Sequence, residues 1–110
     1  MISWWDLTDS PQTIESLRDY LAGGGIEPWT SVEGLCLKFW MADADRNRWG
    51  AVMVWESDRT PERLPAHVAR DLIGYPATER LSFDIEATVE GIHSLTTLAG
   101  LRPATSWRQP

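Results

Sequence analysis

The sequence has few of the residues from which disulfides, metal sites and membrane anchors are built. Its only cysteine is Cys36, so no internal disulfide can form and no second thiolate stands at metal-ligand spacing. No apolar run approaches the roughly 20 residues that cross a bilayer, and the N-terminus lacks the basic and apolar regions of a secretory signal. We therefore expect a cytoplasmic protein with no metal site and no membrane partner.

Basic residues are also scarce, with 10 against 16 acidic residues and a net charge of −6. This charge repels a phosphate backbone, which excludes nucleic acid as a partner. The glycines of Gly23-Gly24-Gly25 follow a helical pattern instead of opening one, so they do not form a phosphate-binding loop. No serine or cysteine is paired with a histidine for nucleophilic catalysis. We expect no cofactor.

Tryptophan, in contrast, is abundant. It supplies 7 of the 11 aromatic residues in a chain of 110 residues, which is long enough for one core and not for two. Tryptophan is bulky, and a small core houses few indole rings. Some of these rings are therefore expected to line a pocket or an interface.

The hydrophobic pattern predicts an α+β domain of ferredoxin-like β-α-β-β-α-β order with a four-stranded antiparallel sheet. Capping residues and prolines begin the two expected helices, and glycines end them. We expect one domain over 1–91 and a C-terminal arm over 92–110 that docks on a partner subunit. The expected elements are a strand over 2–7, a helix over 14–21, strands over 35–41 and 49–56, a helix over 60–73 and a strand over 81–90.

The hairpin predicts a sheet with two different faces. If the turn lies near Asp45, aliphatic side chains of both strands share one face, which we expect to accept the helices. The other face gathers tryptophans and is too apolar to remain in water as a broad patch. A second copy of the chain covers it most simply, which predicts a homodimer. We expect two groups of side chains: Leu35, Leu37, Phe39, Met41, Val52, Val54, Leu81, Phe83 and Ile85 under the helices, and Cys36, Lys38, Trp40, Trp49, Met53, Trp55, Asp84 and Glu86 facing the second copy.

Three stretches of the sequence carry a resemblance to a known family. They are Gly34-Leu35-x-x-Lys38-x-Trp40, Gly50-x-x-x-x-Trp55-Glu56-Ser57 and Phe83-Asp84-Ile85-Glu86. This pattern resembles the mono-oxygenases of the YdhR-like group in the dimeric α/β barrel superfamily. The resemblance implies a barrel made by two facing sheets and an apolar, aromatic-lined cavity. Related barrels oxygenate aromatic polyketides without a cofactor, isomerise lactones or degrade haem.

Three titratable residues are candidates for catalysis. Glu86 and Asp84 share one face of the last strand at a separation that suits acid/base chemistry, and Lys38 is their natural counter-ion. Paired in this way, the same three groups have a purely structural role. His67 lies on the second expected helix, and Trp55 lies at the end of the strand before it. This arrangement is similar to that in small haem-degrading barrels. The alternative is that His67 faces solvent and binds nothing.

Trp40, Trp55 and Met53 are the candidate ligand-binding residues, because same-face side chains on neighbouring strands form two sides of one slot. The leading function is a cofactor-independent mono-oxygenase or a related enzyme acting on an apolar aromatic small molecule. The alternatives are a non-catalytic dimer that binds an apolar small molecule and a haem-degrading barrel. A polar group with a shifted pKa inside the cavity distinguishes an enzyme from a binding protein.

Overall fold

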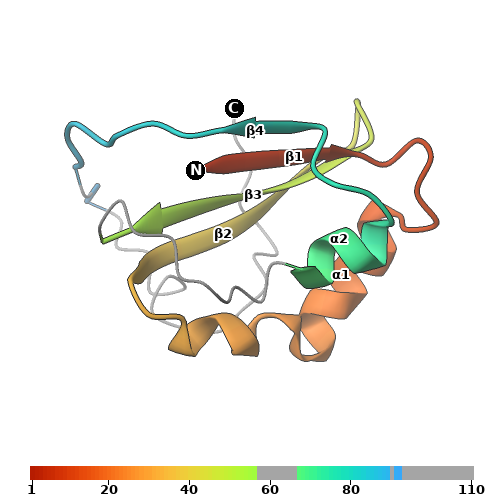
Figure 1. Cartoon of the computed structure of the whole chain (residues 1–110), viewed down its shortest axis with the longest axis horizontal. Coiled ribbons are helices and arrows are strands. Elements are labelled where there is room, and N and C mark those ends of the chain that lie inside the picture. The colour runs from red at the N-terminus through yellow and green to blue at the C-terminus, as the bar shows by residue number, and fades with distance from the viewer. Residues whose placement is uncertain (57–66, 90, 93–110) are drawn as a thin grey trace.

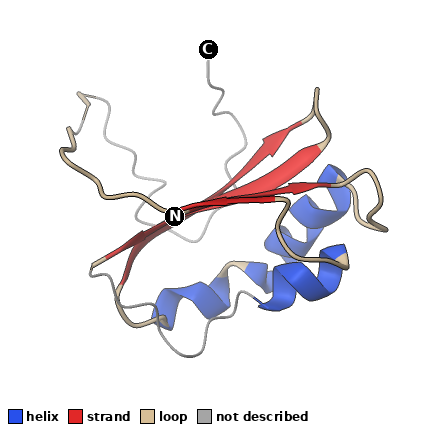
Figure 2. Cartoon of the chain, turned by 45° about the horizontal axis from the view of Figure 1, so that its top comes forward, coloured by secondary structure: helices blue, strands red, loops and turns tan. Residues whose placement is uncertain are grey.

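Four antiparallel strands form one sheet, and the described helices lie together against one of its faces (Figures 1 and 2). The structure is a computed structural model that describes residues 1–56, 67–89 and 91–92. The α+β class and the antiparallel four-stranded sheet are confirmed. The described elements are β1 (Ile2–Asp6), α1 (Ile14–Tyr20), a π-helical turn (Leu21–Gly25), a 3₁₀ helix (Glu27–Ser31), β2 (Leu35–Asp43), β3 (Arg48–Trp55), α2 (His67–Ile73) and β4 (Glu79–Leu81).

The strands lie in the order β2-β3-β1-β4, so the first strand of the chain occupies an interior position. β1 pairs antiparallel with both β3 and β4, and β2 pairs antiparallel with β3. The approach of β1 to β3 is close at Gly50, where a Cβ atom would lie 2.6 Å from the carbonyl oxygen of Ser3. This pair of strands therefore requires glycine at position 50.

α1 begins at a capping box. The Thr13 hydroxyl accepts a hydrogen bond from the Ser16 amide, and the Ser16 hydroxyl accepts one from the Thr13 amide. After Tyr20 the helix widens into the π-helical turn, which ends where Gly24 adopts a φ of +112°. The 3₁₀ helix then begins at Glu27, with Pro28 in its first turn. The chain thus stays on the helical side of the sheet until β2.

The helices cover the tryptophan-rich face of the sheet, so the expectation that they cover the aliphatic face is wrong. Trp49 and Met53 are buried, at 6% and 5% exposure, whereas Phe39 on the opposite face is 41% exposed. The expected grouping of side chains is correct in the middle of the hairpin, where Lys38 pairs with Met53. It is wrong at the end, because a register shift between Leu35 and Leu37 pairs Leu35 with Trp55, which we expect on opposite faces. The buried cluster comprises Leu7, Leu17, Leu21, Trp49 and Ile73, with Trp5, Ile14, Ile26, Trp40 and Tyr75 packed against it.

The reason for this difference is that the helices of this chain supply the cover that we expected from a second copy. Leu17 and Leu21 of the first helical segment pack against Trp49. Large indole rings fill the space between short helices and the sheet, which smaller aliphatic side chains leave open. The tryptophan-rich face therefore needs no partner subunit.

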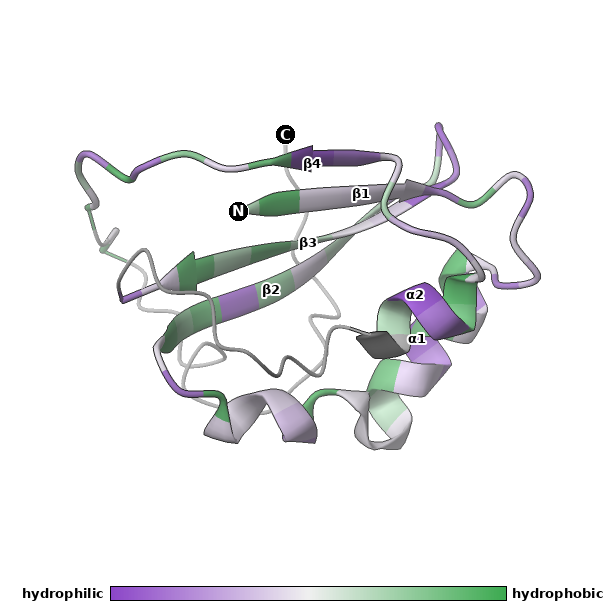
Figure 3. Cartoon of the chain, in the orientation of Figure 1, coloured by the Kyte–Doolittle hydropathy of each residue, from purple (hydrophilic) through white to green (hydrophobic). Residues whose placement is uncertain are grey.

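The last strand is shorter than expected. β4 spans Glu79–Leu81, and residues 82–89 form no regular element, with Phe83 and Ile85 exposed at 57% and 51%. Leu81 pairs with Ile2, the first residue of β1, so the alternating residues that follow have no partner on that strand. Most of β4 is hydrophilic (Figure 3), as is typical of an edge strand.

Several expectations lie outside the described residues. These are the start of the second helix near Thr60 and nearly all of the arm over 92–110. None of the helices within the described ranges combines the length and the apolar character needed to cross a membrane.

Candidate functional site

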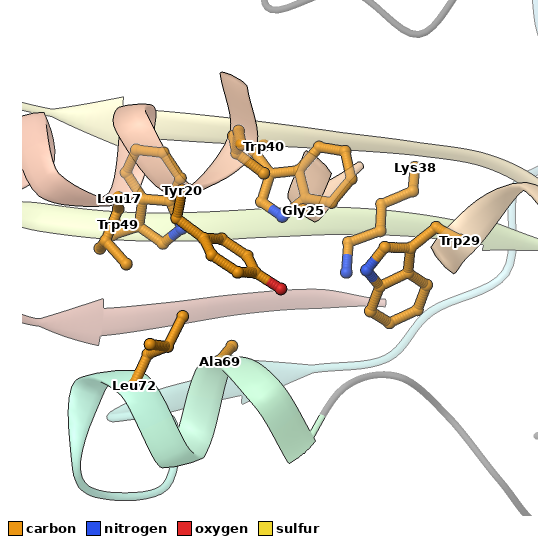
Figure 4. Close-up of a pocket in the computed structure, with 10 residues that line it drawn as sticks. Leu17, Tyr20, Gly25, Trp29, Lys38, Trp40, Trp49, Ala69 and Leu72 are labelled. Carbon is orange, nitrogen blue, oxygen red and sulfur yellow. The ribbon is translucent and has the colours of Figure 1, made fainter. Parts of the chain in front are cut away.

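A pocket lies between the helices and the tryptophan-rich face of the sheet (Figure 4). Its volume is about 30 Å³, which is room for roughly two water molecules. Side chains from β2, β3, α1, α2 and the 3₁₀ helix converge on it, and most of them are apolar. The described lining residues are Leu17, Tyr20, Leu21, Gly25, Trp29, Lys38, Trp40, Trp49, Ala69 and Leu72.

Lys38 is the charged residue of this lining, and it lies between two indole rings. β2 positions it in the middle of the strand, opposite Met53. Its Nζ atom is 3.0 Å from the ring centroid of Trp29 and 4.7 Å from that of Trp40. The two indoles meet edge to face, with centroids 6.4 Å apart. Both rings therefore stabilise a positive charge on the amine through cation–π contacts.

Burial acts on this amine in the opposite direction and lowers the pKa of Lys38 from 10.5 to about 7. The cause is desolvation, which penalises the ammonium form. Within the described ranges, no acidic side chain forms an ion pair with Lys38. At pH 7 about half of the Lys38 amines are therefore neutral, and a neutral amine has a lone pair that serves as a base or a nucleophile.

Lys38 is also the only lysine of the sequence; the other nine of the ten basic residues are arginines. Arginine remains protonated at all pH values that proteins meet, whereas lysine loses its proton readily when it is buried. Among the lysine and arginine side chains, the one that can become neutral thus lies in the pocket. The presence of a single lysine among ten lysine and arginine residues is the signal in the sequence that distinguishes Lys38 from the other candidate residues.

The structure brings Lys38 and Trp40 together in the lining of the pocket, and Met53 lies opposite Lys38 in the sheet without lining the pocket. Met53 is buried in β3, and Glu86 lies in the exposed segment that follows β4. No ion pair joins Lys38 to Glu86 or Asp84. The structure describes the backbone of His67, at the first residue of α2, and not its side chain.

Trp55 lies on β3 beside Gly34 and is half-buried. Its indole Nε1 is buried, and no acceptor in the described part of the chain bonds to it. It is absent from the lining of the pocket, which Trp40 shares with Trp29 instead.

Sequence reasoning missed Trp29 and the role of Tyr20. Trp29 lies between two glycine-containing stretches, and the available signal was Pro28, which favours the first turn of a helix. Tyr20 has the spacing of a core residue on α1, yet its hydroxyl points into the pocket (Figure 4). Its ring covers Gly25 so closely that a Cβ atom has no room there.

Neither a protein-family model nor a curated protein matches this chain. The resemblance of its hairpin to the YdhR-like group therefore remains a proposal. The geometry of the pocket carries the functional argument that follows.

Proposed function

We propose that this protein is an enzyme that binds an apolar aromatic compound between Trp29 and Trp40 and deprotonates it with the Lys38 amine. The observation that carries this proposal is the contact of the Lys38 amine with both indole rings inside an apolar pocket. The reaction that we propose for the deprotonated compound is cofactor-independent mono-oxygenation.

The proton transfer follows from the two opposing effects on Lys38. Desolvation keeps about half of the amines neutral at pH 7, so they can accept a proton from a phenol or an enol. The ammonium that forms keeps its cation–π contact with Trp40, which stabilises it, while the ligand takes its place on Trp29. The new ion pair of phenolate and ammonium is stronger in this apolar lining than in water.

The oxygen step needs little from the protein. An electron-rich anion reacts with oxygen itself once the pocket has bound it, removed its proton and excluded water. No reductant is needed when a CH2 group of the compound becomes C=O, because the compound then supplies all four electrons: one oxygen atom enters it and the other leaves as water. The resemblance of the hairpin to the YdhR-like mono-oxygenases supports this reaction. A binding protein needs only shape and an apolar lining, so a lysine with a lowered pKa in that lining favours an enzyme.

Ligand entry requires some side chains of the pocket to move. A dry cavity that takes benzene measures about 150 Å³, well above the present volume of about 30 Å³. The Lys38 amine now covers one face of Trp29, so a planar ligand that stacks there displaces it. Tyr20, at 36% exposure, and the half-buried Trp29 form the side of the pocket that can open.

Binding of a polycyclic phenol is expected to weaken in Trp29→Phe and Trp40→Phe. Each substitution removes stacking area worth about 1 kcal/mol, or about fivefold in affinity. Trp55→Phe is the matched control, because Trp55 lies on the same sheet outside the pocket lining. The measurement is a fluorescence titration of all four proteins. Weaker binding in Trp55→Phe alone would place the ligand at the end of β3 and contradict the proposed site.

The catalytic part of the proposal is tested on the same phenol by oxygen consumption. Lys38→Met is expected to keep ligand binding and to lose turnover, because Met has a similar length and no lone pair that takes a proton. Binding without oxygen consumption in the wild type would leave a non-catalytic binding protein.

We also propose the ferredoxin-like fold and a homodimer. The order β1-α1-β2-β3-α2-β4 and the strand order β2-β3-β1-β4 support that fold. Part of the sheet face opposite the helices is apolar, with the exposed Phe39 beside the half-buried Leu37, Val52 and Val54. A second copy that covers this patch buries both patches by twofold symmetry.

Sedimentation at micromolar concentration is expected to give a dimer of the 12.4 kDa chain. Phe39→Glu is expected to give monomers, because the pairing would bury an unpaired charge. Ala22→Glu, an exposed position on the helical side, introduces the same charge and is expected to leave the dimer intact. A monomeric wild type would refute the homodimer.

A further inference from the structure

The chain has two kinds of aliphatic amine, the N-terminal amine and the side chain of its single lysine. The N-terminal amine donates a hydrogen bond to the carbonyl oxygen of Met53, at 2.9 Å. The Lys38 amine instead lies against the indole of Trp29, among the apolar side chains of the pocket (Figure 4). The structure therefore presents one amine in an environment that an ordinary surface lysine does not have.

We propose that the Lys38 amine forms a reversible imine with a small apolar aldehyde or ketone that enters between Trp29 and Trp40. The inference rests on the proposed function only for the location of the pocket. It uses the lone pair of the amine to attack carbon, whereas the proposed function uses it to take a proton.

The step conserves atoms and electrons. The nitrogen lone pair of Lys38 forms a bond to the carbonyl carbon, and the electron pair of the C=O bond moves to the oxygen. A proton moves from nitrogen to that oxygen, and the C–O bond then breaks as water leaves. Loss of the second nitrogen proton gives the neutral imine, so one carbonyl compound and one amine yield one imine and one water without an oxidant or reductant.

The surroundings of Lys38 favour this product. Desolvation lowers the pKa of the amine to about 7, so the reactive neutral form is abundant at neutral pH. The imine is also neutral, and an apolar lining penalises it less than the ammonium that it replaces. An aromatic group on the carbonyl compound gains stacking contacts with the two indoles.

The test is reductive trapping with benzaldehyde and sodium cyanoborohydride, followed by mass spectrometry of the intact protein and its peptides. Arg18→Lys supplies the matched reference, because Arg18 is exposed on α1 and the substitution creates an ordinary surface amine in the same molecule. At pH 7 an ordinary lysine holds on the order of a thousandfold less neutral amine than Lys38. We expect Lys38 to be labelled at least tenfold faster than the lysine introduced by Arg18→Lys.

The pH dependence gives a second readout. Labelling of Lys38 is expected to level off above about pH 7, whereas labelling of the introduced lysine continues to rise. Equal labelling of the two side chains, or labelling of the N-terminal amine alone, would overturn the inference. Lys38→Arg is the control for the reagents. It has no lysine, so any labelling of this variant occurs at its N-terminal amine and shows that the reagents react. Phenol binding and oxygen consumption are measured without aldehyde, so failure of the proposed function is recognised separately.

Discussion

Ile73→Ala is expected to lower the free energy of unfolding by about 2–5 kcal/mol, the range for large-to-small changes in a core. Ile73 is fully buried, at 0% exposure, in the cluster that joins α2 to Leu17, Leu21 and Trp49. The substitution therefore leaves a cavity at the point where both helices meet the sheet. Urea denaturation of the wild type and the variant measures the difference.

Phe83→Ala is the matched control for this prediction. Phe83 is larger than Ile73, yet it is 57% exposed in the segment after β4. Its replacement is expected to change the free energy of unfolding by no more than about 0.5 kcal/mol. A larger loss in Phe83→Ala than in Ile73→Ala would mean that the segment after β4, and not α2, covers the core.

Lys38→Met is expected to raise the free energy of unfolding at pH 7 by about 3 kcal/mol. The pKa of Lys38 is about 7 in the folded protein and 10.5 as its ordinary value. Each unit of difference corresponds to about 1.4 kcal/mol, and the partly exposed amine keeps some hydration, which reduces the total. Met retains the length of the side chain and removes the cost of burying a charge.

The sign of the pH dependence follows from the same two values. Between pH 7 and 10.5 the unfolded chain binds more protons at Lys38 than the folded chain, so wild-type stability rises with pH across this window. Below pH 7 the penalty is constant. Lys38→Met is expected to lack the rise, while Leu37→Met, the same new side chain on the opposite face, is expected to retain it. Urea midpoints from pH 6 to 9 test this, and a flat wild-type profile would contradict it.

The elements that depend on neighbouring residues could be predicted from the sequence. α1 begins at a cap and ends near glycines, and β2 and β3 surround a short polar turn; both signals lie within a few residues of the element they define. The position of the turn also predicted that Lys38 and Met53 share a face, and the two residues pair in the sheet. These features therefore required no knowledge of distant parts of the chain.

Two other features of the fold, the sheet face that meets the helices and the length of β4, depend on distant parts of the chain. Hydrophobic alternation groups the side chains of a sheet, but it does not tell which group meets the helices when one face is aliphatic and the other is rich in indoles. The length of β4 depends on where β1 begins, because Leu81 pairs with Ile2.

The same limit applies to the site. The pair of Lys38 and Trp40 could be found on one strand, since residues two apart share a face. Trp29 reaches them from the 3₁₀ helix only because the chain reverses through the π-helical turn. No local pattern places these two segments side by side.

The interior position of β1 has a consequence for the order of events during synthesis. β1 precedes both of its partners, β3 and β4, in the chain. A ribosome must deliver most of the domain before this strand gains hydrogen-bonded neighbours on both sides. Such nonlocal pairing slows folding and leaves apolar surface uncovered in the nascent chain. A chaperone would therefore have a long opportunity to bind the unpaired β1, with its adjacent Trp4 and Trp5, before β3 and β4 emerge.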